Sequence, residues 1–383
     1  MKKRIKVIGK FLFIFLLLGC LAIGGFYAFK KFQSHHDATK KFSSRPTLVK
    51  AKDGNSISAG HHNLEYLKKK LNKKYPNFYN AIYNTPKRTQ VGSDVVIPGQ
   101  VQTMTYSFKK NGLIKTTTMT PQGITVAGKY ILITAYDSTH QSASVIYVLN
   151  KKTGHYIKTI QVNGTPHLGG IAYDPVAKNI WITGSQNGQS ALMSFTYKEL
   201  ENYKFSKKNP FIKYNYIVAL PTIERASAVT YDDNQLFVGF FNKSDKGRIV
   251  AYPIPRVGQF KNTITSDQIK AATGTATWAS GSGAASMNRQ IQGIAVYGDW
   301  IILSQSYGSK DSKLYFFPAS AINNLDESNA DKVVTVPPYL EQIYAYKGQL
   351  LMLFESGAKK YAKDSVTVVD RVLSANINAL LGS

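Results

Sequence analysis

Six polar residues of this sequence could do chemistry, because each lies at the start of a short apolar segment that recurs along the chain. No HExxH, P-loop, GxSxG, CxxC or dinucleotide-binding GxGxxG motif accompanies them. The single cysteine, Cys20, lies in an N-terminal apolar run, which excludes a cysteine nucleophile farther along the chain. The six residues are Gln122, His167, Glu224, Arg225, Gln292 and Glu341.

An imidazole, two carboxylates, two amides and a guanidinium could together bind a polar ligand or a divalent cation. For a cation such as Ca²⁺ or Zn²⁺, the candidate ligands are Glu341, His167 and Glu224, which are also the candidates for a general base. No other cofactor is predicted. Glu341 is the most informative residue, because a carboxylate that enters an apolar strand needs a partner.

Each of these residues also has a purely structural interpretation. Gln122 and Gln292, which both precede Gly-Ile, could hydrogen-bond to neighbouring repeats. His167 lies in the sequence TPHLGG, which is typical of a turn, and Glu224 with Arg225 could be a surface ion pair of small energetic value.

The elements that must position these residues form an internal repeat. The stretch QGITVAGKYILITAYD at 122–137 returns as QGIAVYGDWIILSQSYG at 292–308, and related copies start at Gly169, Ser227 and Glu341. Each copy has an apolar strand, a turn and a second apolar strand. The spacings are 47, 57, 66 and 49 residues when the equivalent positions are taken as Gly123, Gly170, Ser227, Gly293 and Gln342. The glycines are expected to let strands approach closely.

Further strands follow in each copy. A third strand is predicted at 144–154, 190–200, 247–254, 312–318 and 365–372, and a fourth at 156–162, 215–221 and 332–337. Four antiparallel strands every ~40–50 residues are typical of β-propeller blades. We therefore predict an all-β domain over 96–383, a β-propeller with five blades favoured and six possible. A β-sandwich is the alternative, but it does not predict repeats of this period.

Two irregular stretches complete this prediction. The small-residue segment 273–290 is expected to be a loop inserted before the fourth copy. The segment 113–119 is predicted to pair with the last copy, which would close the ring and hide its edges. If 101–119 instead supplies two strands of its own, the propeller has six blades.

Residues 144–184 resemble the YVTN-type propeller repeat of bacterial surface and exported proteins. The matching elements are Ser144-Val145, Asn150, Thr153-Gly154, Thr159-Ile160, Gly170-Ile171-Ala172 and Trp181-Ile182-Thr183. The resemblance implies a propeller fold and, in most such proteins, a binding role, with a minority of enzymes. Fold alone does not decide between these roles.

The N-terminus reads as a membrane anchor. Residues 1–10 carry five positive charges, the uncharged run 11–29 is long enough to span a bilayer, and Lys30 and Lys31 follow it. The positive-inside rule puts residues 1–10 in the cytoplasm and the body outside the cell. Two alternatives remain open, a lipoprotein modified at Cys20 in the lipobox-like sequence LLGC and a cleaved signal peptide. All three interpretations export the body.

Residues 30–95 are expected to form a basic linker or stalk, with a short amphipathic helix at 63–75. Residues 1–95 hold 19 Lys and Arg against four acids, so this part contributes most of the net charge of +26. Lysine outnumbers arginine 40 to eight, which disfavours specific nucleic-acid recognition. The predicted partners are a membrane and an anionic envelope polymer, a glycan or a protein, as on a Gram-positive cell surface.

Two functions follow from this sequence. The first is a non-catalytic binding module, tethered to the membrane and extracellular, whose ligand is a wall polymer, glycan or protein. The alternative is a divalent-cation-dependent hydrolase, of the propeller lactonase kind, or a lyase, with its site at the mouth of the central channel. The sequence does not predict the oligomeric state.

Overall fold

The computed structural model describes residues 49–57, 64–85, 91–220, 225–274, 285–287, 289–361, 363–364 and 366–382. The predicted tail 1–10, the anchor 11–29 with Cys20, and Glu224 lie outside these residues. Among the helices that are described, none is both long enough and apolar enough to cross a bilayer.

Tight turns define the inner hairpins of the structure. In four of five sheets, the first two strands are joined by a two-residue loop, which suits the twist of antiparallel strands when a residue adopts positive φ. Gly298 has φ +55° in the loop between Tyr297 and Trp300, and Gly348 has φ +77° in the loop between Tyr346 and Gln349. The Gly and Asp signals of the sequence repeat therefore mark real hairpins.

Four of the sheets have at least four strands each. Two have the orders β3-β4-β5-β6 and β7-β8-β9-β10, from β3 (Met119–Ala127), β4 (Tyr130–Asp137), β5 (Val145–Asn150), β6 (Tyr156–Gln161), β7 (Ile171–Asp174), β8 (Asn179–Gln186), β9 (Gln189–Thr196) and β10 (Tyr216–Ala219). The third sheet has the order β11-β12-β13-β14-β18, from β11 (Ala226–Asp232), β12 (Gln235–Phe240), β13 (Gly247–Pro253), β14 (Ala285–Met287) and β18 (Asn324–Leu325). The fourth has the order β15-β16-β17-β19, from β15 (Ile291–Tyr297), β16 (Trp300–Gln305), β17 (Ser312–Pro318) and β19 (Lys332–Val336).

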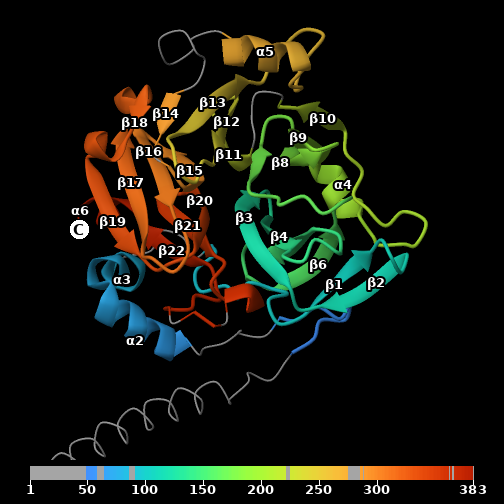
Figure 1. Ribbon diagram of the computed structural model, residues 1–383, viewed down its shortest axis with the longest axis horizontal. Coiled ribbons are helices and arrows are strands. Elements are labelled where there is room, and N and C mark those ends of the chain that lie inside the picture. Colours follow the sequence, from blue (N-terminus) through green and yellow to red (C-terminus); the bar gives the residue numbers. More distant parts are fainter. Residues whose placement is uncertain are drawn as a thin grey trace, which may run out of the picture. The chain divides into compact units, whose positions relative to one another are not determined.

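The last sheet has three strands in the described chain, β20 (Leu340–Tyr346), β21 (Gln349–Phe354) and β22 (Leu373–Asn376). The first strands of the five sheets contact one another in a closed sequence, β3, β7, β11, β15, β20 and back to β3. Figure 1 shows β3, β11, β15 and β20 near the centre, with the later strands farther out. The fold is a five-bladed β-propeller, as the repeat predicted.

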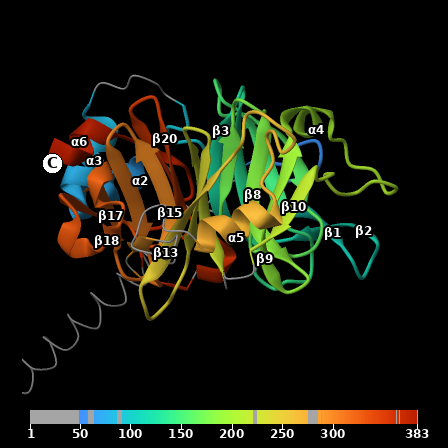
Figure 2. The same ribbon diagram turned by 90° about the horizontal axis from the view of Figure 1, so that it is seen from above.

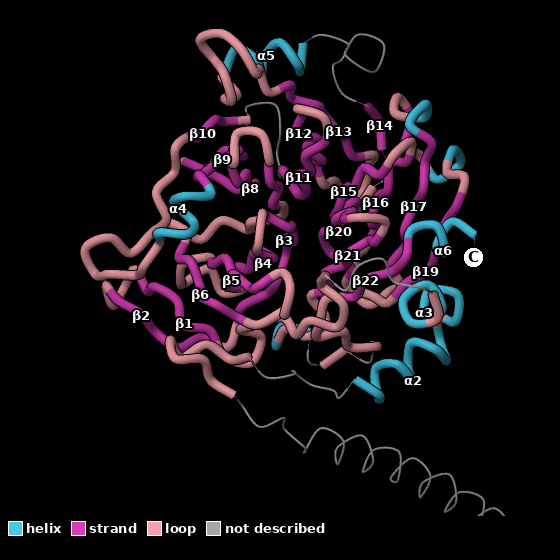
Figure 3. Tube along the Cα trace, turned by 180° about the vertical axis from the view of Figure 1, so that it is seen from behind, coloured by secondary structure: helices cyan, strands magenta, loops and turns pink. Residues whose placement is uncertain are grey.

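Closure of the ring differs from the prediction. The expected closing segment 113–119 does not pair with the last blade, because β2 (Gly112–Thr116) forms a separate hairpin with β1 (Thr103–Ser107). A local hairpin loses less loop-closure entropy than a pairing across the whole chain. Figure 3 shows this hairpin apart from the centre, beyond β6, so it is not a sixth blade.

The seam, where the start of the propeller meets its last blade, is formed instead by residues 95–97 and 370–372. Val96 forms an isolated bridge with Arg371, Ile97 donates to the Asp370 carbonyl at 3.1 Å, and Val372 donates to the Val95 carbonyl at 2.8 Å. The predicted third strand 365–372 is thus wrong, since the strand itself begins at Leu373. The stretch 273–290 was expected to be a loop, but β14 within it pairs with β13 and serves as the fourth strand of its blade.

Short helices connect or flank the blades. Of these, α4 (Tyr197–Asn202) follows β9 and starts with a capping box between Thr196 and Glu199. The helix α5 (Ser266–Gly274) follows β13, and single 3-10 turns lie at η1 (Ala319–Ala321), η2 (Glu327–Asn329) and η3 (Lys359–Tyr361). The C-terminal helix is α6 (Ile377–Gly382).

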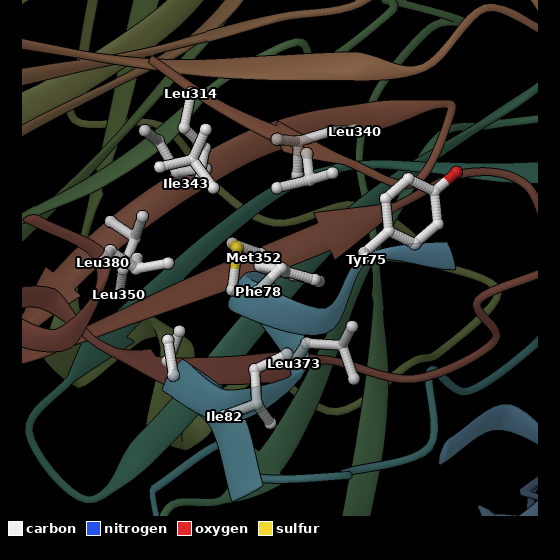
Figure 4. Packing of buried hydrophobic residues seen from close by; sticks show 14 of the residues in the cluster. Tyr75, Phe78, Ile82, Leu314, Leu340, Ile343, Leu350, Met352, Leu373 and Leu380 are labelled. Carbon is white, nitrogen blue, oxygen red and sulfur yellow. The ribbon is translucent and has the colours of Figure 1, made fainter. Parts of the chain in front are cut away.

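Two helices from the predicted stalk are part of the body. The helices α2 (Leu64–Lys74) and α3 (Pro76–Tyr83) bury Leu67, Leu71 and Phe78 in a core cluster with the last two blades. Figure 4 shows Phe78 and Ile82 beside Met352 and Leu373, and Figure 2 shows α2, α3 and α6 gathered at one side. The sequence assigned 30–95 to a linker, but the apolar stripe of these helices needs burial, and the free flank of β22 supplies it.

The centre of the ring is filled by one side chain. Gln342 of the last blade is fully buried, and its amide makes four hydrogen bonds to the inner strands of three other blades. Its Oε1 accepts from the N–H of Ile124 at 3.1 Å and of Ile171 at 2.9 Å. Its Nε2 donates to the carbonyls of Ile171 and Val229, both at 2.9 Å.

Small residues at the equivalent positions leave room for this amide. A Cβ on Gly123 would lie 2.8 Å from the Gln342 Oε1, and one on Gly170 would lie 2.4 Å from the Val229 nitrogen. Both distances are shorter than real contacts, so these glycines are required by close approach, as the sequence predicted.

We expect Gln342→Ala to lower the free energy of unfolding by roughly 3 kcal/mol, because it leaves several buried backbone groups unpaired and opens a void. Urea unfolding followed by tryptophan fluorescence measures this. Gln189→Ala, at the exposed first residue of β9, is the matched control and should change stability by less than about 0.5 kcal/mol. Equal effects of the two substitutions would contradict a central role for Gln342.

We also expect Phe78→Ala to destabilise the protein by about 3–5 kcal/mol, since Phe78 is 1% exposed in the core cluster. Phe108→Ala is the control, because that ring is 44% exposed on the outer hairpin. Thermal unfolding of both variants tests whether α3 is an integral part of the propeller. A stalk that hangs free would give no difference between them.

Candidate functional site

A cavity of about 680 Å³ lies at the mouth of the central channel. Five of the six residues singled out by sequence line it, and the sixth, Glu224, lies outside the described residues. The five are Gln122, His167, Arg225, Gln292 and Glu341. They converge because each lies at or just before the innermost strand of a different blade. Gln342 directly follows Glu341 and is not part of the lining, so it closes the axis just beyond the cavity.

The cavity has residues that sequence reasoning missed. Aromatic rings line much of it, together with a second carboxyl, a lysine, a histidine and hydroxyl groups. Most come from the ends of the second strands or the loops that follow them, whereas Ser190 lies in β9, Ser227 in β11 and Tyr339 just before β20. The main ones are Tyr136, His140, Ser190, Ser227, Phe241, Ser306, Tyr307, Tyr339, Glu355, Lys360 and Tyr361.

Two carboxyl groups meet in this wall. Glu341 and Glu355 are 3% and 7% exposed, and their side chains hydrogen-bond to each other. Burial, followed by the charge of Glu355, raises the pKa of Glu341 well above its ordinary value. Burial also raises the pKa of Glu355. Ionisation of both carboxyls is therefore disfavoured, and the hydrogen bond between them favours the proton on Glu341, since it raises the pKa of Glu341 and lowers that of Glu355.

Neighbouring donors stabilise the Glu355 carboxylate. The Gln122 Nε2 donates to it at 3.0 Å, and the Tyr361 hydroxyl also hydrogen-bonds to it. Burial and the Glu355 charge raise the pKa of Tyr361, so its hydroxyl keeps the proton that it donates. Gln122 belongs to the first blade and Glu355 to the last, so this bond also links the two blades at the seam.

Lys360 lies beside this pair. Its Nζ donates to the Tyr136 hydroxyl at 3.2 Å and lies 5.1 Å from the centre of the Tyr361 ring. Burial lowers its pKa, but Tyr136 and the two carboxyls oppose this, and the pKa is raised overall. The ammonium therefore stays charged and partly offsets the charge of the carboxylate.

His167 contacts the same tyrosine as Lys360. Its ring packs on Tyr136 with centroids 4.1 Å apart, and it is open to the water of the cavity. Crowding by surrounding protein lowers the pKa of His167, and the charges of Lys360, His140 and Arg225 lower it further. The solvent that still reaches the ring weakens these effects without changing their direction. His167 is accordingly neutral at pH 7.

Three of the lining residues have an unusual backbone conformation. His140, Leu168 and Tyr339 all line the cavity and have φ values of 54°, 56° and 65°, the left-handed region that non-glycine residues disfavour. The loop that carries His140 is held by Asp137, which accepts hydrogen bonds from the hydroxyls of Thr139 and Ser142, both at 2.7 Å. Such strain, about 1 kcal/mol or more per residue, is concentrated at functional sites in many proteins.

The predicted cation site is not assembled by the residues described. Glu341 and His167 both line the cavity, but no group of three or more His, Cys, Asp or Glu side chains in the described ranges could hold a metal ion. The raised pKa of Glu341 favours its protonated form, and Lys360 with Arg225 adds positive charge, which disfavours a divalent cation. Glu224, the third candidate ligand, lies outside the described residues, so the Ca²⁺ or Zn²⁺ site stays a prediction.

No protein-family profile matches the chain, and no curated protein matches it in sequence. The resemblance of 144–184 to YVTN-type repeats therefore stays a prediction.

The chain is similar in structure to several solved proteins at low identity. The PQQ-bound aldose sugar dehydrogenase of Streptomyces coelicolor has a TM-score of 0.39 and 10% identity, over 72% of this chain and 96% of that one. A chain of a nidogen/laminin complex has a TM-score of 0.36 and 10% identity, over 66% and 84%. The Dos1 propeller has a TM-score of 0.32 and 7% identity, and the match covers 68% of this chain and 61% of that one. The fold assignment rests on the five sheets themselves.

The carboxyl pair should make stability depend on pH. In the folded chain the pKa of Glu341 is raised, so the unfolded chain binds fewer protons once the pH exceeds about 4.3, the ordinary value for glutamate. The free energy of unfolding therefore falls as pH rises from there through the raised pKa. Glu341→Gln keeps a neutral donor beside Glu355, so we expect it to exceed the parent in stability at pH 8 by at least about 1 kcal/mol.

Urea unfolding of both proteins from pH 4 to pH 8 tests this. The advantage of the variant should shrink toward pH 4, where Glu341 is protonated in both states. Glu201→Gln, at an exposed pair with Lys129, is the control and should leave the pH profile near that of the parent. A Glu341→Gln profile parallel to the parent would show that Glu341 is ionised in the folded protein.

Proposed function

We propose that this chain is a binding protein, and that its ligand is a sugar-sized segment of a cell-envelope polymer or glycan held in the channel-mouth cavity. The observation that carries this proposal is the lining itself, in which polar side chains from all five blades and several tyrosines surround one cavity of about 680 Å³. That volume is in the range of small-molecule sites, which run from roughly 300 to 1,000 Å³.

The chemistry of the lining suits a polyhydroxylated ligand. Aromatic faces such as that of Tyr307, which is 44% exposed, can pack against the C–H face of a sugar ring. Gln292 offers both a donor and an acceptor to hydroxyl groups, and Ser306 and Ser227 offer hydroxyls.

The location of the protein is part of the same proposal. The apolar run 11–29, with its flanking lysines, would hold the propeller outside the membrane, where envelope polymers are accessible. A protein partner could be presented to the same face. The strong lysine content would favour partners of negative charge.

A second candidate function is supported by the carboxyl pair. A buried glutamic acid that keeps its proton and faces a cavity is a common general acid, and its partner carboxylate can act as the base. An enzyme of this kind would be a hydrolase or lyase acting on the same ligand without the predicted cation. It would convert the bound sugar to a new product, which mass spectrometry of the incubated ligand detects.

The binding proposal is tested with the full-length protein in detergent, using isothermal titration against purified cell-wall glycan fragments and simple oligosaccharides. We expect saturable binding, weakened at least tenfold by Tyr307→Ala, since stacking on one aromatic ring contributes about 1.4 kcal/mol. Phe260→Ala is the control, because that ring is 51% exposed and lies outside the cavity.

Two results would contradict the proposal. One is the absence of binding to every glycan fragment and oligosaccharide. The other is binding that Tyr307→Ala and Gln292→Ala leave unchanged, which would place the ligand elsewhere on the protein.

A further inference from the structure

The charges around the cavity do not cancel. Among the described residues, two cationic side chains, Arg225 and Lys360, line it, and the two carboxyls hydrogen-bond to each other so that ionisation of both is disfavoured. His167 is neutral beside them. The described part of the wall therefore favours an excess of positive charge, although two of its members are glutamates.

The carboxylate is already engaged within the protein. Glu355 accepts hydrogen bonds from Gln122, Glu341 and Tyr361, and the charge of Lys360 lowers its pKa. These contacts satisfy the negative charge from inside the wall. The carboxylate is therefore not the group that balances Arg225.

Arg225 differs from Arg256 and Arg371, which both form ion pairs with aspartates. Arg256 forms a two-pronged pair with Asp174 at 2.8 and 2.9 Å, and Arg371 pairs with Asp370 at 3.0 Å. Arg225 has no acidic partner among the described residues, and its side chain is exposed at the mouth of the cavity. A guanidinium presents several donors in one plane and binds planar or tetrahedral anions well.

The neighbours of Arg225 extend its positive field. The charges of Arg225, Lys360 and His140, which lie on three other segments that line the cavity, act on His167 and lower its pKa. Its ring nitrogens are also available to donate or accept a hydrogen bond at the cavity surface. Because the cavity is concave and partly walled from water, charges there interact more strongly than on an open surface.

From this geometry we infer that the ligand carries an acidic group, and that this group binds at Arg225 with His167 and Lys360 beside it. This inference rests on the proposed function, since it names the class of sugar that the same cavity takes. The shared chemistry is an anionic oxygen group, supplied either by a sugar carboxylate or by a sugar phosphate. The rings and amides of the wall then bind the uncharged part of the ligand.

The experiment compares matched probes on the full-length protein by isothermal titration and ligand-observed NMR at pH 7. The probes are glucose, glucuronate and glucose 6-phosphate, which separate a neutral sugar, a carboxylate and a phosphate. We expect at least one acidic probe to bind ten times more tightly than glucose. We expect Arg225→Gln to reduce that preference to less than twofold, and added salt to weaken the acidic probe alone.

Arg248→Gln is the matched control, because Arg248 is also exposed but lies outside the cavity. It should leave the preference for acidic probes unchanged. Circular dichroism of both variants checks that the propeller is intact, since neither guanidinium is buried.

The outcomes distinguish the acidic-ligand inference from the glycan-binding function on which it rests. Equal affinity for neutral and acidic probes, with Tyr307→Ala still weakening both, overturns the acidic-ligand inference and leaves the glycan proposal standing. A preference for acidic probes that persists in Arg225→Gln overturns the role of Arg225. Failure of every probe and every glycan fragment to bind overturns both.

Discussion

The structure depends on the filling of its central axis. Five inner strands that converge on one line bring their backbones together, and at that line there is space for one long side chain but not for five. Small residues stand at four of the equivalent positions, and Gln342 stands at the fifth. Its amide joins three blades that the sheet hydrogen bonds do not connect. The same side chain ends the open channel, so the fold and the floor of the cavity have a common cause.

The blades are joined around that axis by a few specific polar contacts. Thr134 of the first blade donates to the Leu168 carbonyl at 2.8 Å, and Ser304 of the fourth donates to the Glu341 carbonyl at 2.8 Å. Arg256 and Asp174 join the second and third blades farther out. The functional wall uses the same junctions, since the Gln122–Glu355 bond links the first and last blades. Alteration of the wall therefore also disturbs the contacts between blades.

The repeat allowed much of this to be predicted. Strand position follows from apolar alternation and from turns such as Gly298-Asp299, which are local signals. The mouth residues followed from topology, because a residue at the start of an inner strand must reach the rim. Glu355 was missed because the prediction considered only the starts of the innermost strands, and Glu355 follows the second strand of its blade. Its position could have been found from the hairpin, since antiparallel pairing of Leu340 with Phe354 returns the chain to the level of Glu341.

Other features had no local signal. Lys360 and Tyr361 lie in a single 3-10 turn between irregular segments, where no periodicity exists to place them. The segment 113–119, which includes most of β2, was assigned to the last blade because its sequence favours a strand, and strand propensity does not specify a partner. The amphipathic pattern of α2 predicted a buried face but not the surface that buries it. These choices are made by tertiary packing.

The seam has a consequence for association between copies of the chain. In most propellers a strand from the other end of the chain occupies the free flank of the last blade, but among the residues that the structure describes β22 has a strand neighbour, β21, on one side only. Residues 95–97 pair with 370–372, just before β22, and α3 packs against β22 itself. A helix shields an edge without using its backbone donors and acceptors. Release of α3 would thus uncover a template for intermolecular β-pairing, and proteolysis near residues 64–83 would convert a well-packed domain into one that assembles edge to edge.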